Sequence, residues 1–236
     1  MTIRMAAPAL VTLISLSCGL AAIEAAHAGQ WDMAFRFIMA AAIADAMDGT
    51  LARLLHASSD MGKELDSLSD LVTFGAAPAF LFASRYSSAP TEVIFGAMVL
   101  FVAAGAYRLA RYNGQSSRGD NFCGMPITAA GLLLAAAVAG PVALTHVEAV
   151  AVAIALSALM VSRAPFPMLK FGWGLLLPAL GAAIIPVALA NSVEWLAVVA
   201  ILVLGIYVVM GVANALSDHV ADAVPEEVRE DAPAHT

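Results

Sequence analysis

Long apolar runs occupy nearly the whole chain, and they restrict its fold more than any other feature of the sequence. A helix needs about 20 mostly apolar residues to cross a hydrocarbon core of roughly 30 Å. Of the 236 residues, 61% are hydrophobic and only 12% are charged. Because only helices and closed barrels satisfy the backbone in lipid, these runs predict an all-α polytopic membrane protein. We expect eight membrane-spanning helices, at residues 7–26, 32–56, 65–85, 91–113, 126–145, 147–162, 171–190 and 193–216.

These spans leave no room for a separate soluble domain. We expect residues 1–216 to form one transmembrane catalytic domain, and the Glu- and Pro-containing residues 217–236 to form an acidic, disordered cytoplasmic tail. Arg4, an apolar run and the sequence Ala26-His27-Ala28 also resemble a cleavable signal peptide. The apolar run is long for a signal peptide, however, and suits a complete span.

The basic residues are distributed unevenly between the two sides of the predicted membrane. Most lie on the side shared by both termini, and only Arg36 and Arg85 lie on the other. The positive-inside rule then predicts that both termini lie in the cytoplasm. We expect the membrane to be a bacterial-type inner membrane, with the active site facing the cytoplasm. No basic patch interleaved with aromatic residues suggests a nucleic-acid partner. Cys18 and Cys123 lie far apart on different expected elements, so no disulfide framework is expected.

Four aspartates lie at helical spacing where the second and third spans meet the cytoplasmic surface. Asp45 and Asp48 are three residues apart, and Asp66 and Asp70 are four apart, so each pair shares a helix face. A short turn between antiparallel helices would bring the pairs together. Four ionised Asp at helix centres would cost about 10 kcal/mol on insertion scales, so their charge needs compensation.

Hard divalent cations with oxygen ligands would compensate this charge. Carboxylate clusters that hold two metals are a recurring device for displacement at phosphorus. Gly49 and Ala52 would leave the helix face open, Gly62 permits a close backbone approach, and Arg53 offers a planar fork to a diphosphate. Two other interpretations are a structural polar cluster, with the aspartates protonated or paired to Arg53 and Lys63, and a cation transporter. Neither explains the spacing of the glycines, the alanine and the arginine.

The same residues resemble the signature of the CDP-alcohol phosphatidyltransferases, D-x2-D-G-x2-A-R-x8-G-x3-D-x3-D, at every fixed position. The resemblance implies a six-helix core plus two further helices, and two bound divalent cations, Mg²⁺ or Mn²⁺. It implies that Asp70 is both a metal ligand and the general base. The implied metal ligands are Asp45, Asp48, Asp66 and Asp70, and the implied CDP-pocket residues are Gly49, Ala52, Arg53 and Gly62.

Further blocks resemble one branch of this family, the integral-membrane phosphatidylserine synthases. The similar blocks are Glu64 to Asp70 with Phe74, Gly75 and Pro78, then Arg108 to Asn113, Phe122 to Pro126, and Val161 to Arg163. This resemblance implies transfer of a phosphatidyl group from CDP-diacylglycerol to the hydroxyl of L-serine, with release of CMP. The resemblance also allows a homodimer. Glycerol 3-phosphate, inositol phosphate and choline remain as alternative acceptors.

The first span departs from the pattern of many relatives at one position. Those relatives begin it with Pro-Asn-x-x-Thr, whereas this chain has Pro8-Ala9-Leu10-Val11-Thr12. The resemblance implies that Thr12 is a nucleotide-binding residue and that Ala9 removes one nucleotide contact.

A site for serine should offer a cation to its carboxylate. The candidates are Arg108, Arg111 and Arg118 at the cytoplasmic end of the fourth span and in the loop after it. Arg111 is favoured as a carboxylate or lipid-phosphate contact, because it shares a helix face with Arg108. The alternative is that all three contact lipid headgroups and reflect only the positive-inside rule.

Overall fold

A computed structural model describes residues 3–55, 59–116, 124–141, 143–164 and 193–222 of the chain. The described elements are all helical, which confirms the predicted all-α class. They are α1 (Ile3–His27), α2 (Trp31–Leu54), α3 (Asp60–Asp70), the π-helical segment η1 (Leu71–Ala76), α4 (Ala77–Arg85), α5 (Thr91–Ser116), α6 (Ile127–Ala139), α7 (His146–Val161) and α9 (Val193–Asp222).

Most predicted spans correspond to a described helix. Three helical stretches, Ala7–His27, Asp60–Arg85 and Thr91–Gly114, are long and apolar enough to cross a membrane. The fifth span is shorter than expected, because α6 ends at Ala139 where Gly140 and Pro141 follow. The last span runs on to Asp222, past its predicted end at residue 216. The span expected at 171–190 lies outside the described residues, so the count of eight stays a prediction.

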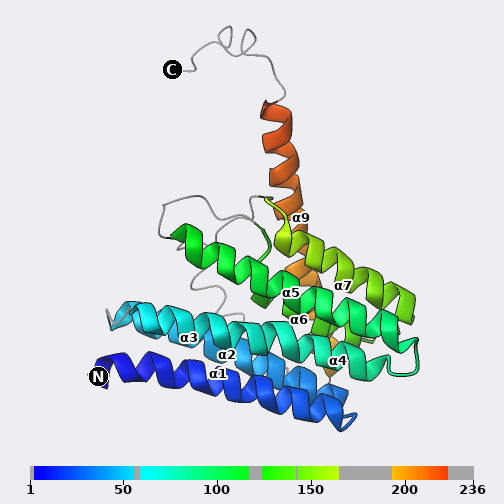
Figure 1. The fold of residues 1–236 in the computed structure, drawn as a ribbon, viewed down its shortest axis with the longest axis horizontal. Coiled ribbons are helices and arrows are strands. Elements are labelled where there is room, and N and C mark those ends of the chain that lie inside the picture. Colours follow the sequence, from blue (N-terminus) through cyan, green and yellow to red (C-terminus); the bar gives the residue numbers. More distant parts are fainter. Residues whose placement is uncertain (1–2, 56–58, 117–123, 142, 165–192, 223–236) are drawn as a thin grey trace, which may run out of the picture.

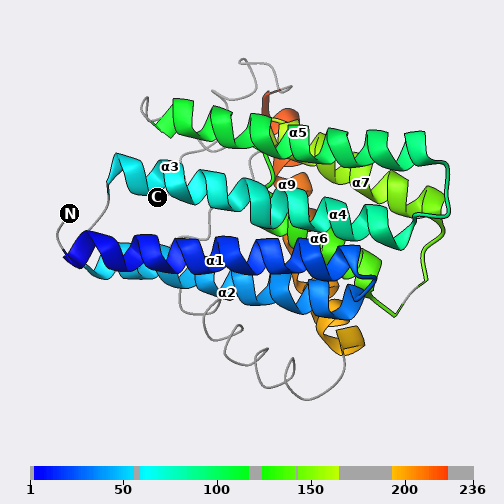
Figure 2. The same ribbon diagram turned by 60° about the horizontal axis from the view of Figure 1, so that its bottom comes forward.

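The helices gather the residues of interest at one end of the bundle. α1 and α2 form an antiparallel hairpin, and α3, η1 and α4 form one continuous rod beside them (Figure 1). The start of α1, the end of α2, the start of α3 and the end of α5 all lie at the left of both views (Figure 2). We call this the site end. α9 crosses the direction of these helices steeply (Figure 1).

The third span contains a π-helical turn, which the sequence analysis did not predict. The turn begins directly after Asp70. Its Thr73 is fully buried, and the Thr73 hydroxyl donates a hydrogen bond to the carbonyl oxygen of Ser15 in α1 (3.4 Å). Gly19 of α1 and Gly131 of α6 allow this approach, because a Cβ at either position would overlap atoms of Thr73 or the backbone of Phe74. Small residues on α1 and α6 therefore allow both helices to pack closely against the π turn.

Candidate active site

Three of the predicted carboxylates converge at the site end of the bundle. Carboxylate oxygens of Asp45 and Asp48 in α2 and of Asp66 in α3 all lie within 4.8 Å of one another. α1 packs along both α2 and α3, whereas the backbones of α2 and α3 make little direct contact. The three carboxylates therefore reach across the space between these two helices. Asp48 is buried, and Asp45 and Asp66 are half-buried.

Asp70 joins this group from one turn further along α3. Its carboxyl group interacts electrostatically with those of Asp45 and Asp66. Asp70 also interacts electrostatically with Arg108 of α5. Asp70 therefore interacts with both the carboxylate cluster and Arg108, and its role as metal ligand and general base stays a prediction.

The cluster suits hard divalent cations. The converging groups offer only oxygen ligands, which Mg²⁺ and Mn²⁺ prefer. Within the described part of the chain, none of the four aspartates forms an ion pair. Lys63 contacts Asp60 instead, at 3.5 Å. Lys63 therefore does not neutralise the cluster in this structure, whereas the side chain of Arg53 lies outside the described residues.

Thr12 orients one of the cluster's carboxylates. Its buried hydroxyl lies 2.7 Å from Oδ2 of Asp48, to which it donates a hydrogen bond. Its own carbonyl oxygen accepts a hydrogen bond from Ser69 of α3 (3.2 Å). One residue thus ties α1 to both carboxylate-bearing helices, and groups of this kind set the geometry of metal ligands. A contact between Thr12 and the nucleotide stays a prediction.

The predicted nucleotide pocket is described only in part. Gly49 is exposed, and a Cβ there would meet no atom within 4 Å, which agrees with an open helix face. Ala52 is half-buried on the same helix. A Cβ on Gly62 would lie 3.1 Å from Oγ of Ser59, which caps the start of α3. The side chain of Arg53 and the whole of Arg118 lie outside the described residues.

The two described arginines of α5 have different surroundings. Arg111 donates hydrogen bonds to three carbonyl oxygens at the end of α7, those of Val161 (2.8 Å), Ser162 (3.0 Å) and Met160 (3.2 Å). The guanidinium of Arg108 instead lies 5.5 Å from the ring centroid of Tyr112, near Asp70. Arg111 therefore holds α5 to α7, and its contact with a substrate stays a prediction.

Sequence reasoning missed a polar bridge beside the cluster. Asn113 of α5 donates a hydrogen bond from Nδ2 to Oγ of Ser67 in α3 (3.1 Å). Ser67 directly follows Asp66, and Asn113 ends the Arg-Leu-Ala-Arg-Tyr-Asn block, so both lay in motifs already singled out. Their pairing could not be found from the sequence, because it depends on how α3 and α5 lie in space.

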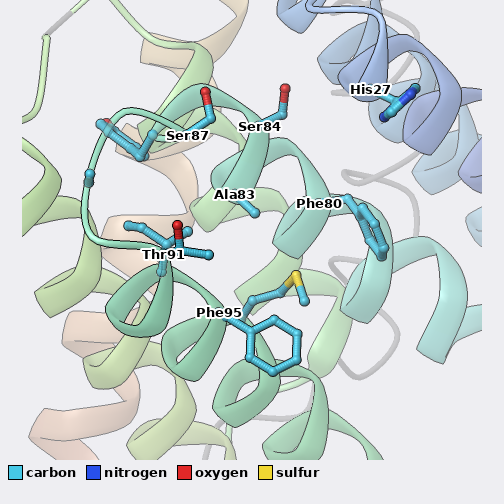
Figure 3. Close-up of a pocket in the computed structure, with 11 residues that line it drawn as sticks. His27, Phe80, Ala83, Ser84, Ser87, Thr91 and Phe95 are labelled. Atoms are coloured by element: carbon cyan, nitrogen blue, oxygen red, sulfur yellow. The ribbon is translucent and has the colours of Figure 1, made fainter.

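A hollow of about 450 Å³ lies at the opposite end of the bundle, and it holds none of this chemistry. Phe80 and Phe95 lie along it, with Ser84 at the end of α4, Ser87 in the turn after it and Thr91 at the start of α5 (Figure 3). Neither Asp nor Glu occurs among its described lining residues. The carboxylate cluster, and not this hollow, is the candidate active site.

Comparison with known proteins agrees with this geometry. The CDP-alcohol phosphatidyltransferase family model matches residues 5–203. The chain is similar to proteins named CDP-diacylglycerol–serine O-phosphatidyltransferase. It is 37% identical to the Bacillus subtilis protein over 167 residues, which cover 69% of this chain and 90% of that protein. It is 31% identical to a Helicobacter pylori protein over 218 residues, which cover 89% and 90% of the two chains.

A Mycobacterium tuberculosis protein of the same name is 40% identical over 130 residues. These residues cover 52% of this chain and 45% of that longer protein. The family match spans every aspartate of the cluster and every described helix that positions them. The chain is therefore a membrane protein of the CDP-alcohol phosphatidyltransferase family.

Proposed function

We propose that this protein transfers the phosphatidyl group of CDP-diacylglycerol to the hydroxyl of L-serine, giving phosphatidylserine and CMP. The observation that carries the proposal is the convergence of Asp45, Asp48 and Asp66, with Asp70 beside them, at the spacing that the family signature requires. The relatives named above supply the choice of serine as acceptor.

The aspartates divide into metal ligands and a base. Asp45, Asp48 and Asp66 would hold divalent cations, with Asp70 contributing to the second, and Mg²⁺ or Mn²⁺ suits these oxygen ligands. When bound, such cations neutralise the diphosphate and the charge that develops on it. Thr12 holds Asp48 in place for this task.

Asp70 would act on the acceptor. It takes the proton from the serine hydroxyl while the serine oxygen forms a bond to the phosphorus nearer the lipid. The bond from that phosphorus to the CMP oxygen breaks, and CMP leaves with the electron pair. Most of the rate enhancement comes from positioning the two substrates and from stabilising charge. Gly49, Ala52, Arg53 and Gly62 would form the pocket that positions the CDP group.

We place the site at the cytoplasmic face of the membrane. The site end of the bundle holds the start of α1 and the end of α5, which carries Arg108 and Arg111. Arg85 lies at the opposite end, where its guanidinium packs 4.4 Å from the ring centroid of Trp31. This distribution of basic residues supports cytoplasmic termini. CDP-diacylglycerol would then keep its acyl chains in the bilayer and its nucleotide in the cytoplasm.

The test is CMP release by detergent-purified protein supplied with CDP-diacylglycerol and Mn²⁺ or Mg²⁺. L-Serine, glycerol 3-phosphate, inositol phosphate and choline are offered separately, and reactions without metal are the control. We expect CMP only with serine and only with metal. CMP release with another acceptor instead would support phosphatidyl transfer but show that serine is not the acceptor. No release with any acceptor from folded protein would contradict the proposal, and cation transport would become the alternative to test.

A further inference from the structure

The three-residue spacing of Arg108 and Arg111 places them on one face of α5, but only one of them is fully engaged by the protein. Arg111 donates to three carbonyl oxygens at the end of α7. Gly124 packs against the same guanidinium, because a Cβ at this positive-φ residue would lie 2.6 Å from Nη2 of Arg111. Arg111 therefore closes the contact between α5, α7 and the segment before α6.

Arg108 has guanidinium N–H donors that are not used within the described part of the chain. It is half-buried, and no hydrogen bond or ion pair joins it to any residue in the described part of the chain. Its guanidinium lies 5.5 Å from the ring centroid of Tyr112 and interacts electrostatically with Asp70 and Tyr207. Among the described side chains no fully buried nitrogen lacks a partner, so the N–H groups of Arg108 remain accessible. A half-buried cation with accessible donors is suited to an anionic ligand.

The position of Arg108 relative to Asp70 indicates which anion it receives. Asp70 interacts electrostatically with both Asp45 and Arg108. The bridge between Ser67 and Asn113 spans the same two helices, and so helps to hold α3 and α5 at a fixed separation. A hydroxyl that gives its proton to Asp70 would enter beside Arg108. In serine, three bonds separate the hydroxyl oxygen from the carboxylate carbon, so the carboxylate lies within a few ångströms of the reacting oxygen.

We propose that Arg108 binds the carboxylate of the acceptor serine and thereby selects it. The inference rests on the proposed function and adds the residue that recognises the acceptor. The planar guanidinium matches a carboxylate with two parallel hydrogen bonds, which an ammonium group cannot reproduce. The other anion available is the diphosphate of the donor lipid, and the experiment distinguishes the two.

The experiment compares L-serine with L-serinamide, which keeps the hydroxyl and the ammonium but lacks the carboxylate. Arg108→Gln should lower kcat/KM for serine about tenfold to a hundredfold, the usual loss for a hydrogen bond to a charged group. For serinamide the loss should be several-fold at most, so the preference for serine falls. The KM for CDP-diacylglycerol and the dependence on Mn²⁺ should not change. Arg108→Lys should recover only part of the preference.

Arg111→Gln is the matched control. It removes the same charge one helical turn away, and it should lower the thermal stability while leaving the serine-to-serinamide ratio unchanged. Equal losses for both acceptors in Arg108→Gln would overturn the inference. A rise in the KM for CDP-diacylglycerol instead would assign Arg108 to the diphosphate of the donor.

Three further outcomes each have a defined interpretation. If serinamide turnover is too slow to measure, the two KM values of Arg108→Gln are compared with those of the wild type. A raised KM for serine alone would support the inference, and a raised KM for CDP-diacylglycerol alone would overturn it. If Arg108→Gln does not fold, the serine-to-serinamide preference and the KM for CDP-diacylglycerol are measured on Arg108→Lys instead, with the same interpretation. Wild-type protein that releases no CMP with serine would refute the proposed function itself, a result distinct from failure of the inference.

Discussion

Thr12 offers a way to perturb the metal site without touching a ligand. Its hydroxyl donates to Oδ2 of Asp48 at 2.7 Å, and its side chain is only 5% exposed. Thr12→Val keeps the β-branched shape and removes the donor. The Thr12 backbone carbonyl, which accepts from Ser69, is retained. The substitution removes the donor to Asp48 together with a longer local contact, 3.1 Å, from the same hydroxyl to the carbonyl oxygen of Pro8.

The size of the effect follows from the hydrogen bond to Asp48, which is the shorter of the two contacts and the one to a charged group. A hydrogen bond to a charged group contributes about 1.5–3 kcal/mol, and each 1.4 kcal/mol corresponds to a factor of ten. Loss of an outer-shell partner typically costs about 10–100-fold in metal affinity or activity. We therefore expect the Mn²⁺ concentration for half-maximal CMP release to rise about tenfold to a hundredfold. The rate at saturating Mn²⁺ should return close to that of the wild type.

The assay is a Mn²⁺ titration of CMP release at saturating CDP-diacylglycerol and serine. Ser17→Ala is the control, since Ser17 lies in the same helix and its hydroxyl contacts only the carbonyl oxygen of Leu13 among the described residues. A Mn²⁺ dependence in Thr12→Val equal to that of the control would refute the argument that Thr12 orients a metal ligand. A raised KM for CDP-diacylglycerol with unchanged Mn²⁺ dependence would instead favour the predicted nucleotide contact.

Three further predictions concern the base, the metal and the π turn. Asp70→Asn should lower CMP release by a factor of about 100 or more, with an unchanged melting temperature, since a general base contributes about 10²–10⁴ in rate; near-wild-type turnover would remove Asp70 from that role. A chelator should abolish CMP release and added Mn²⁺ or Mg²⁺ should restore it, whereas chelator-resistant release would contradict a metal mechanism. Gly131→Ala should destabilise the fold by about 1–3 kcal/mol in thermal unfolding, because its Cβ would overlap the backbone of Phe74. Gly96→Ala is its control, since a Cβ there meets nothing within 4 Å. Equal melting temperatures of the two variants would refute the argument that Gly131 makes room for the π turn.

The helices were predictable because apolar length is a strong signal. α1, α2 and α5 begin and end within a few residues of the predicted bounds, except that α1 begins earlier, at Ile3. Gly140 and Pro141 signal the early end of α6 in the sequence. The predicted span ran past them because it followed hydropathy alone. The π turn could not be predicted, because α- and π-helical residues share the same apolar composition. It depends on contacts with Gly19 and Gly131 from distant parts of the chain.

The candidate site, like the fold, could be predicted only in part from the sequence. The three- and four-residue spacings of the aspartates indicated a shared helix face, and a short connection between the two helices indicated that the pairs would meet. The roles of Arg108 and Arg111 could not be separated from sequence, since both lie on one face of α5. Only the position of α7 shows that its terminal carbonyls engage Arg111 and leave Arg108 beside Asp70.

The most direct test of the central claim is the transfer of labelled serine into lipid. Purified protein in liposomes containing CDP-diacylglycerol is given labelled L-serine and Mn²⁺, and the lipid product and CMP are measured together. We predict phosphatidylserine and CMP in equal amounts from the wild type, and neither from Asp70→Asn or in the presence of a chelator. CMP without labelled lipid, or labelled lipid without metal, would contradict the account.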